Sequence, residues 1–147
     1  MLTQEEADYL ISIDKIIENP KKVKFPLPGE QKEYVVHSGD KKEKFLLDIN
    51  RGYIKLSKCT YQNRYRRDIV LLRLDIDGRP HTNPSELGGE TIECPQLHIF
   101  KEGYADRYAI PLPNEFSVDE DIITKFFEFM EFCKIDNAND VHIQGVI

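Results

Sequence analysis

Short apolar segments separated by turn residues constrain the fold of this chain more than any other feature. We predict strands at Tyr34–His37, Glu43–Ile49, Tyr53–Lys58, Asp68–Asp77, Gln96–Lys101 and Tyr104–Leu112. Several of these segments alternate apolar and polar side chains, which is typical of antiparallel strands with one buried face. Glycine-containing turns such as Asn50-Arg51-Gly52 favour hairpins between neighbouring segments. The pattern, with a short strand added by the tail, predicts an antiparallel sheet of six or seven strands.

A helix is predicted on each side of these strands in the sequence. Thr3–Asn19 begins with a T-x-x-E capping box and repeats apolar residues at helical spacing. Ser117–Ile135 begins with a second box, at Ser117 and Glu120, and lines one face with aromatic side chains. The chain is therefore predicted to fold as one α+β domain, residues 1–147, with both helices packed on a curved sheet.

The acidic composition excludes some functions and leaves others open. The chain has 147 residues, 40% of them hydrophobic, and a formal net charge of −6. The hydrophobic fraction is enough for one hydrophobic core. The negative net charge argues against a protein that coats nucleic acid without specificity. Residues 51–81, however, carry eight basic and three acidic side chains. A local basic face on an acidic protein is therefore consistent with the sequence.

Cysteine usage and the first residues predict a cytoplasmic protein. The three cysteines, Cys59, Cys94 and Cys133, are odd in number and far apart, which favours free thiols in a reducing compartment. The charged, capped first helix does not have the pattern of a signal peptide. No apolar run approaches the roughly 20 residues of a membrane span. We therefore predict no membrane partner.

Two histidines beside a proline- and glycine-rich flap, residues 81–95, are the first candidates for chemistry. His81 opens the flap, and His98 points away from the core side of a strand that follows it. Histidines suit both proton transfers of metal-independent RNA cleavage, and an arginine can stabilise the phosphorane. The predicted catalytic set contains residues of these types and one carboxylate: His81, His98, Arg73, Glu102 and Arg107. No cofactor is expected.

Each of these residues also has a structural interpretation. His98 can be an ordinary strand histidine that bonds a carbonyl, and Arg73 can form an ion pair with Asp75. A metal site that uses Cys94 and His98, with His81 and Cys59, is the alternative chemistry. The spacing of these side chains is poor for zinc, so no residue is predicted to bind a metal ion.

An aromatic and basic segment predicts contact with single-stranded RNA. Tyr61, Arg64, Arg66 and Arg67 combine a ring that can stack on a base with guanidinium groups that bind phosphate. The alternative is that these residues only lie in solvent at the start of a strand, where Arg67 pairs with Asp68.

The central part of the chain resembles a family of uncharacterised bacterial domains. The resemblance is carried by the runs CTYQNRYR (59–66), LLRLDI (71–76), PHTNP (80–84) and CPQLHIFKEGYADRYA (94–109). The family has histidine where this chain has Gln96, which weakens any scheme that needs two histidines on that strand. The resemblance implies no established activity. By analogy of size and site, the chain is similar to the RNase toxins of toxin–antitoxin pairs.

Two hypotheses of different classes follow. The first is a metal-independent RNA-cleaving toxin or phage-defence component, with an antitoxin as protein partner. The second is a non-enzymatic module that binds a protein or RNA.

Overall fold

The structure, a computed structural model, describes residues 1–55, 57–118 and 121–143. Within these ranges the α-helices are α1 (Gln4–Ser12) and α2 (Ile122–Phe132). The strands of the same ranges are β1 (Lys15–Ile17), β2 (Gln31–Ser38), β3 (Lys44–Arg51), β4 (Cys59–Tyr65), β5 (Ile69–Asp75), β6 (His81–Thr82), β7 (Thr91–Ile92), β8 (Gln96–Ile99) and β9 (Ala109–Pro111). Short 3-10 turns lie at Pro20–Lys22, Ser85–Leu87 and Ala138–Asp140.

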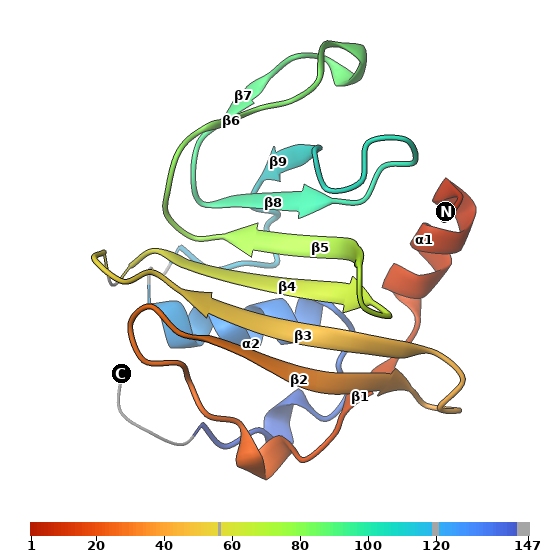
Figure 1. Cartoon of the computed structure of the whole chain (residues 1–147), viewed down its shortest axis with the longest axis vertical. Helices are drawn as coiled ribbons and strands as arrows, with labels where there is room; N and C mark the ends of the chain where they lie inside the picture. The colour runs from red at the N-terminus through yellow and green to blue at the C-terminus, as the bar shows by residue number, and fades with distance from the viewer. Residues whose placement is uncertain (56, 119–120, 144–147) are drawn as a thin grey trace.

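Seven of the described strands form one antiparallel sheet in the order β1-β2-β3-β4-β5-β8-β9, and β6 pairs with β7 as a separate hairpin. Figure 1 shows α2 lying across one face of this sheet and α1 beside its end. We call the face covered by α2 the inner face, and the opposite face, toward the viewer in Figure 1, the outer face. The predicted α+β fold, with an N-terminal and a C-terminal helix on an antiparallel sheet, is confirmed.

Aromatic side chains join α2 to the inner face. The ring centroids of Phe126 and Phe129 lie 5.2 Å and 6.1 Å from that of Tyr61 on β4. The Tyr61 hydroxyl donates a 2.5 Å hydrogen bond to the carbonyl of Ile122, at the start of α2. Burial of each such side chain is worth about 1.5–3 kcal/mol. These contacts hold α2 against the middle of the sheet.

No helix of the described residues lies over the outer face (Figure 1), which carries polar side chains. On β5, Arg73 and Asp75 point outward, with 26% and 21% of their side chains exposed. Leu72 and Leu74 are buried on the inner side. The outer side of segment 68–77 is therefore partly open to solvent, although its sequence is apolar at nearly every position.

A β-bulge explains why the sequence of β5 is apolar at consecutive positions. The register between β4 and β5 shifts between Asn63 and Arg64. Leu71 and Leu72 are both buried beside this shift, because a bulge places an extra residue out of the alternation. The continuous apolar run therefore reflects a local irregularity and not a covered outer face.

The first helix is shorter than predicted. It ends at Ser12 and not at Asn19, and Lys15–Ile17 forms edge strand β1, which pairs with Val36–Ser38 of β2. The Lys15 ammonium is fully buried and donates to three carbonyls, those of Ile11, Ile13 and Cys133. Pairing with β2 and the hydrogen bonds of Lys15 stabilise β1 more than helical spacing of the apolar residues stabilises a longer helix. Isolated helical turns are only marginally stable.

The second helix begins later than predicted. Asp121 is its N-cap and accepts a 3.1 Å hydrogen bond from the amide of Thr124. Glu120 of the predicted capping box lies outside the described residues. Ser117 instead donates its amide to the Glu128 carboxylate at 2.9 Å, so it belongs to the loop that precedes α2.

Two predicted strands differ from the structure. The described residues of Tyr53–Lys58 form no strand, and a 2.6 Å hydrogen bond runs from the amide of Gly52 to the carbonyl of Lys58. Ile54 is 93% exposed, and Leu56 lies outside the described residues. Of Tyr104–Leu112, only Ala109–Pro111 pairs as strand β9.

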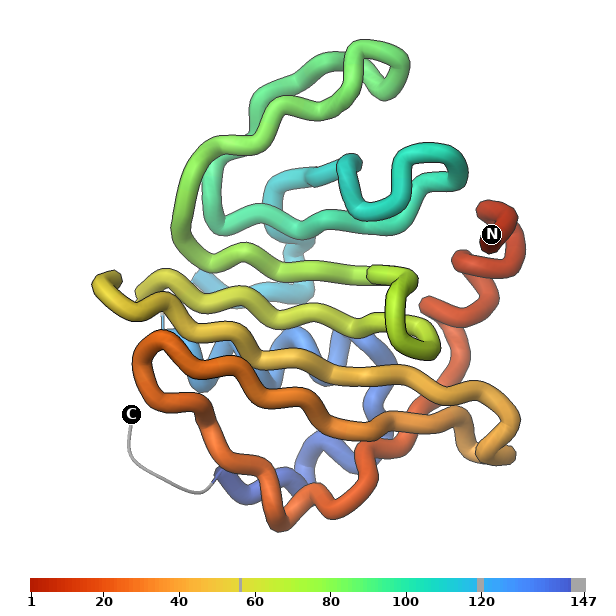
Figure 2. The backbone as a smooth tube through the Cα atoms, viewed as in Figure 1, coloured from red at the N-terminus to blue at the C-terminus, as the bar shows by residue number. Residues whose placement is uncertain are grey.

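The predicted flap takes the form of the β6–β7 hairpin with a 3-10 turn between the two strands. Figure 2 shows this hairpin extending past β9, at the end of the molecule away from β1. The flap therefore stands at the edge of the sheet where His98 lies.

Candidate functional site

Three of the predicted catalytic residues lie together beside the flap. Arg73 on β5 and His98 on β8 are opposite each other in the strand register. The rings of His98 and of His81, on β6, are 4.8 Å apart between centroids in an edge-to-face arrangement. We call these three side chains, with Asp75 and Asp106, the histidine cluster. Its members come from β5, β6, β8 and the segment before β9, so only the folded sheet brings them together.

His98 is enclosed and held at both ring nitrogens. The residue is 1% exposed. Its Nδ1 lies 2.8 Å from the carbonyl oxygen of Asp106, and its Nε2 lies 2.7 Å from Oε1 of Gln96. The Gln96 amide is oriented by a 2.8 Å hydrogen bond to the carbonyl of Ile92. Arg73 Nη2 also lies 3.1 Å from Nε2, so the ring contacts two oxygen acceptors and one guanidinium donor.

Two carboxylates surround Arg73. Its Nη1 lies 2.5 Å from Asp106 Oδ2, and its Nε lies 3.2 Å from Asp75 Oδ1. Asp75 Oδ2 is also 3.3 Å from Nε2 of His98. Burial by itself would raise the pKa of Asp75, but the hydrogen bond with His98 and the charge of Arg73 hold that pKa below its usual range. Two carboxylates of the same chain therefore balance the charge of Arg73.

The flap covers the cluster and is fastened to β9. His81 Nε2 donates to the carbonyl of Arg107 at 2.8 Å. The buried carboxamide of Asn83 donates to the carbonyl of Ala109 at 2.9 Å and accepts from its amide at 2.8 Å. This reciprocal pair satisfies both polar groups of a side chain that is removed from water. His81, which is half-buried, is therefore the more accessible of the two histidines.

The other two predicted catalytic side chains do not join the cluster. Glu102 is exposed and accepts a 2.8 Å hydrogen bond from the amide of Gln4, where it caps the start of α1. The Arg107 guanidinium lies over the ring of Tyr104, 5.5 Å from its centroid. Arg107 contributes only its carbonyl to the flap contact.

The four predicted RNA-binding residues do not share one surface. Tyr61 is fully buried on the inner face. Arg64 binds Asp48 through two hydrogen bonds of 2.6 and 2.8 Å and lies 2.6 Å from Glu33. The hydrogen bonds to Asp48 raise the pKa of Arg64. The guanidinium is therefore already engaged by two carboxylates.

Arg66 and Arg67 lie in the turn between β4 and β5. Arg66 has a positive φ of 57° and stacks over Tyr65, 5.0 Å from the ring centroid. Arg67 is exposed, and its carbonyl accepts a hydrogen bond from Arg64. These two side chains point into solvent at the end of the sheet, away from the buried Tyr61.

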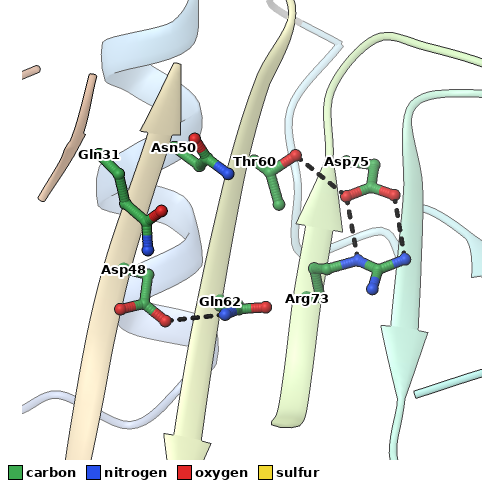
Figure 3. A pocket seen from close by; sticks show the side chains of 7 residues that line it. All are labelled: Gln31, Asp48, Asn50, Thr60, Gln62, Arg73 and Asp75. Atoms are coloured by element: carbon green, nitrogen blue, oxygen red, sulfur yellow. Dashed lines mark hydrogen bonds and ion pairs between the residues drawn. The ribbon is translucent and has the colours of Figure 1, made fainter. Parts of the chain in front are cut away.

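A polar pocket adjoins the histidine cluster on the outer face (Figure 3). Its volume is about 330 Å³. The pocket spans β2 to β5 and is lined by Gln31, Asp48, Asn50, Thr60, Gln62, Arg73 and Asp75. Arg73 and Asp75 belong to both the pocket and the cluster, so the two features form one continuous polar site.

Sequence reasoning missed several residues of this site. Asp48, Gln62 and Asp106 were not among the predicted residues, and Gln96 was noted only as a departure from the family pattern, although each contacts a predicted residue. The alternation of β3 and β4 was the available signal for Asp48 and Gln62, because it turns both toward the outer face. Asp106 lies outside any strand, and its contact with Arg73 depends on the path of the chain between β8 and β9.

The described residues contain no group of three histidine, cysteine, aspartate or glutamate side chains placed to hold a metal ion. Cys59 is buried, and the Cys94 thiol faces the carbonyl of Arg79 at 3.7 Å. The cysteines that the metal alternative requires therefore do not meet His98.

The fold and the site define an α+β domain with a polar pocket and a histidine cluster on the open face of an antiparallel sheet. Residues 2–135 match the model of a family of unknown function, DUF6978. The chain belongs to this family, which agrees with the resemblance seen in the sequence. Comparisons with curated proteins and with solved structures found no match. Neither α-helix of the described residues has the length and apolar character needed to cross a membrane.

Proposed function

We propose that this protein is a non-enzymatic binding domain whose partner is another protein. The proposal is carried by an exposed apolar surface, the apolar tip, formed by Leu27, Tyr53 and Ile54. Their exposed fractions are 60%, 78% and 93%. Exposed aromatic and aliphatic side chains beside polar groups are typical of the centre of a protein interface.

The apolar tip is held in place by the backbone beneath it. The amide of Gly29 donates to the carbonyl of Arg51 at 3.1 Å, which ties the segment after Leu27 to the start of the loop that carries Tyr53. Tyr53 lies so close to Gly29 that a Cβ there would be 2.6 Å from its ring, and the φ of Gly29 is +82°. A preformed tip lowers the entropy lost on binding.

The charge arrangement favours a protein over RNA. Arg64 and Arg73, the arginines of the outer face that were predicted to bind or stabilise phosphate, already contact carboxylates of the chain. A phosphate backbone would have to displace these partners and approach carboxylates that repel it. A protein partner needs no such displacement.

The double variant Tyr53→Ser with Ile54→Asp should lose its protein partner. Removing an aromatic anchor and placing a charge at the interface centre should weaken binding at least about tenfold. The tagged chain is purified from cells that naturally express it, and the bound protein is quantified by mass spectrometry. Tyr9→Ser, at another exposed apolar position on α1, is the matched control. Equal recovery of the same partner with the double variant and the control would contradict the proposal.

A second candidate function is RNA cleavage centred on His81, which we propose from the contact between His81, His98 and Arg73. Because His81 Nε2 donates to the Arg107 carbonyl, the neutral ring keeps a lone pair on Nδ1, as a general base requires. Arg73 would supply the charge that stabilises the phosphorane after it leaves Asp106. The enclosed His98 would orient the site and would not touch the substrate.

His81→Ala tests the second candidate. If the chain cleaves RNA, inducing the unmodified protein should arrest growth and degrade cellular RNA, and His81→Ala should reduce cleavage by about 10²–10⁴-fold. Growth curves and RNA integrity on gels are the measurements. His37→Ala, which changes a histidine of β2 that bonds the carbonyl of Ser38, serves as the control. Harmless expression of the unmodified protein and both variants alike would exclude this function.

A further inference from the structure

The polar pocket of the outer face has a floor of fixed charges. Asp48 is buried and receives hydrogen bonds from Arg64 and from Nε2 of Gln62, the latter at 2.8 Å. Asp75 is held by Arg73 and accepts a 3.2 Å hydrogen bond from the hydroxyl of Thr60. Neither carboxylate has to reorganise when a ligand arrives, so the pocket is preorganised.

Three carboxamides above this floor have hydrogen-bonding capacity left for a ligand. Figure 3 shows the Gln62 amide with its nitrogen toward Asp48 and its oxygen turned toward Arg73 across the pocket. No described residue forms a hydrogen bond with the carboxamide of Gln31 or Asn50. Each free carboxamide offers donors and an acceptor at fixed separation. The pocket therefore presents both kinds of group to one ligand.

The remaining lining side chains restrict the ligand's chemistry. Two carboxylates and one guanidinium line the pocket, so its charge disfavours phosphates and carboxylates. None of its described lining side chains is aromatic, so a nucleobase would find no ring to stack on. A volume of about 330 Å³ is within the range of small-molecule pockets. These features together select a small, neutral ligand rich in hydroxyl groups.

We propose that this pocket binds a neutral polyhydroxylated ligand, a mono- or disaccharide. Adjacent hydroxyls of a sugar match a carboxamide or carboxylate in pairs, one donating and one accepting. Gln31, Asn50 and Gln62 supply these pairs, while the oxygens of Asp48 and Asp75 are engaged by Arg64, Arg73 and their polar neighbours. The proposal concerns a site separate from the apolar tip and does not depend on the protein partner.

Isothermal titration calorimetry of the full chain tests this assignment. The probes are glucose, galactose, mannose, maltose and sucrose, with glucose 6-phosphate and adenosine as the charged and the aromatic comparison. At least one neutral sugar should bind with saturation. Glucose 6-phosphate and adenosine should bind at least about tenfold more weakly, because the first meets the carboxylates and the second finds no stacking surface.

The double variant Gln31→Leu with Asn50→Leu should weaken sugar binding at least about tenfold, since it removes the free carboxamides and keeps their approximate size. Asn139→Leu, at an exposed carboxamide outside the pocket, is the control, and thermal unfolding verifies that all three proteins fold. Three results would overturn the proposal: no saturable binding by any neutral sugar, equal binding by the double variant, or tighter binding of glucose 6-phosphate or adenosine. Binding of the protein partner at the apolar tip is measured in a separate experiment. Its failure would not change the result for sugar binding.

Discussion

Asp48→Ala should lower the free energy of unfolding by about 3–5 kcal/mol, the usual loss when one partner of a buried ion pair is removed. The Asp48 side chain is 2% exposed and Arg64 is 16% exposed, so water screens their contact little. The substitution leaves the Arg64 guanidinium with the exposed Glu33 as its remaining carboxylate, beside the Arg67 carbonyl, and leaves the Gln62 amide nitrogen without its acceptor. Urea denaturation followed by circular dichroism measures the change.

A double-mutant cycle identifies the source of this loss. If the unpaired guanidinium causes it, Arg64→Ala should be less destabilising in the Asp48→Ala background than in the unmodified protein. Asp14→Ala, which changes an exposed carboxylate, provides the control for general loss of charge. A loss below about 1 kcal/mol for Asp48→Ala would place the pair among ordinary surface ion pairs and contradict the interpretation.

Lys15 should make the unfolding free energy depend on pH in the alkaline range. Burial lowers the pKa of Lys15 from 10.5 to about 8 in the folded protein. Between these values the unfolded chain holds the proton more tightly than the folded chain does, so stability rises as pH increases. The full effect is about 3–4 kcal/mol, from roughly 2.5 pH units at about 1.4 kcal/mol each. The measurement is urea denaturation at pH 7, 8, 9 and 10.

Lys15→Met isolates this contribution from those of other groups. Burial raises the pKa of Cys133 to about 12, which makes stability fall as pH rises above 9. Because both proteins contain Cys133, most of its contribution is common to them. The unmodified protein should gain about 2–3 kcal/mol relative to Lys15→Met between pH 8 and pH 10. Parallel curves for the two proteins would refute the prediction.

Most of the fold could be predicted because it depends on local pattern. The alternation in Glu43–Ile49 survives as β3, and the proline and glycine residues of 81–95 mark the flap. The errors occurred where tertiary contacts outweigh local preference. Ile16 and Ile17 fit a helix by spacing, yet they pair with β2. The loop at Tyr53 alternates like a strand but finds no neighbour to pair with in the described structure.

The candidate site was predictable only in part. The alternation of β8 turns His98 away from Leu97, and Arg73 was conspicuous as a cation within an apolar strand. Strand order determines which predicted residues meet. Strands β5 and β8 are paired, although the flap separates them in the sequence. That pairing brings His98 to Arg73, whereas Tyr61 turns inward and Glu102 caps α1.

The sequence by itself determined the α+β class, the family resemblance and the residue types that gather near the flap, because these follow from periodicity, turn residues and motif runs. Only the tertiary structure decided how those residues are used. Hydrogen-bond register and burial place Asp75 and Asp106 around Arg73 and enclose His98. A charged side chain in a partly buried site needs a partner, and strand order and chain path determine which residue supplies it.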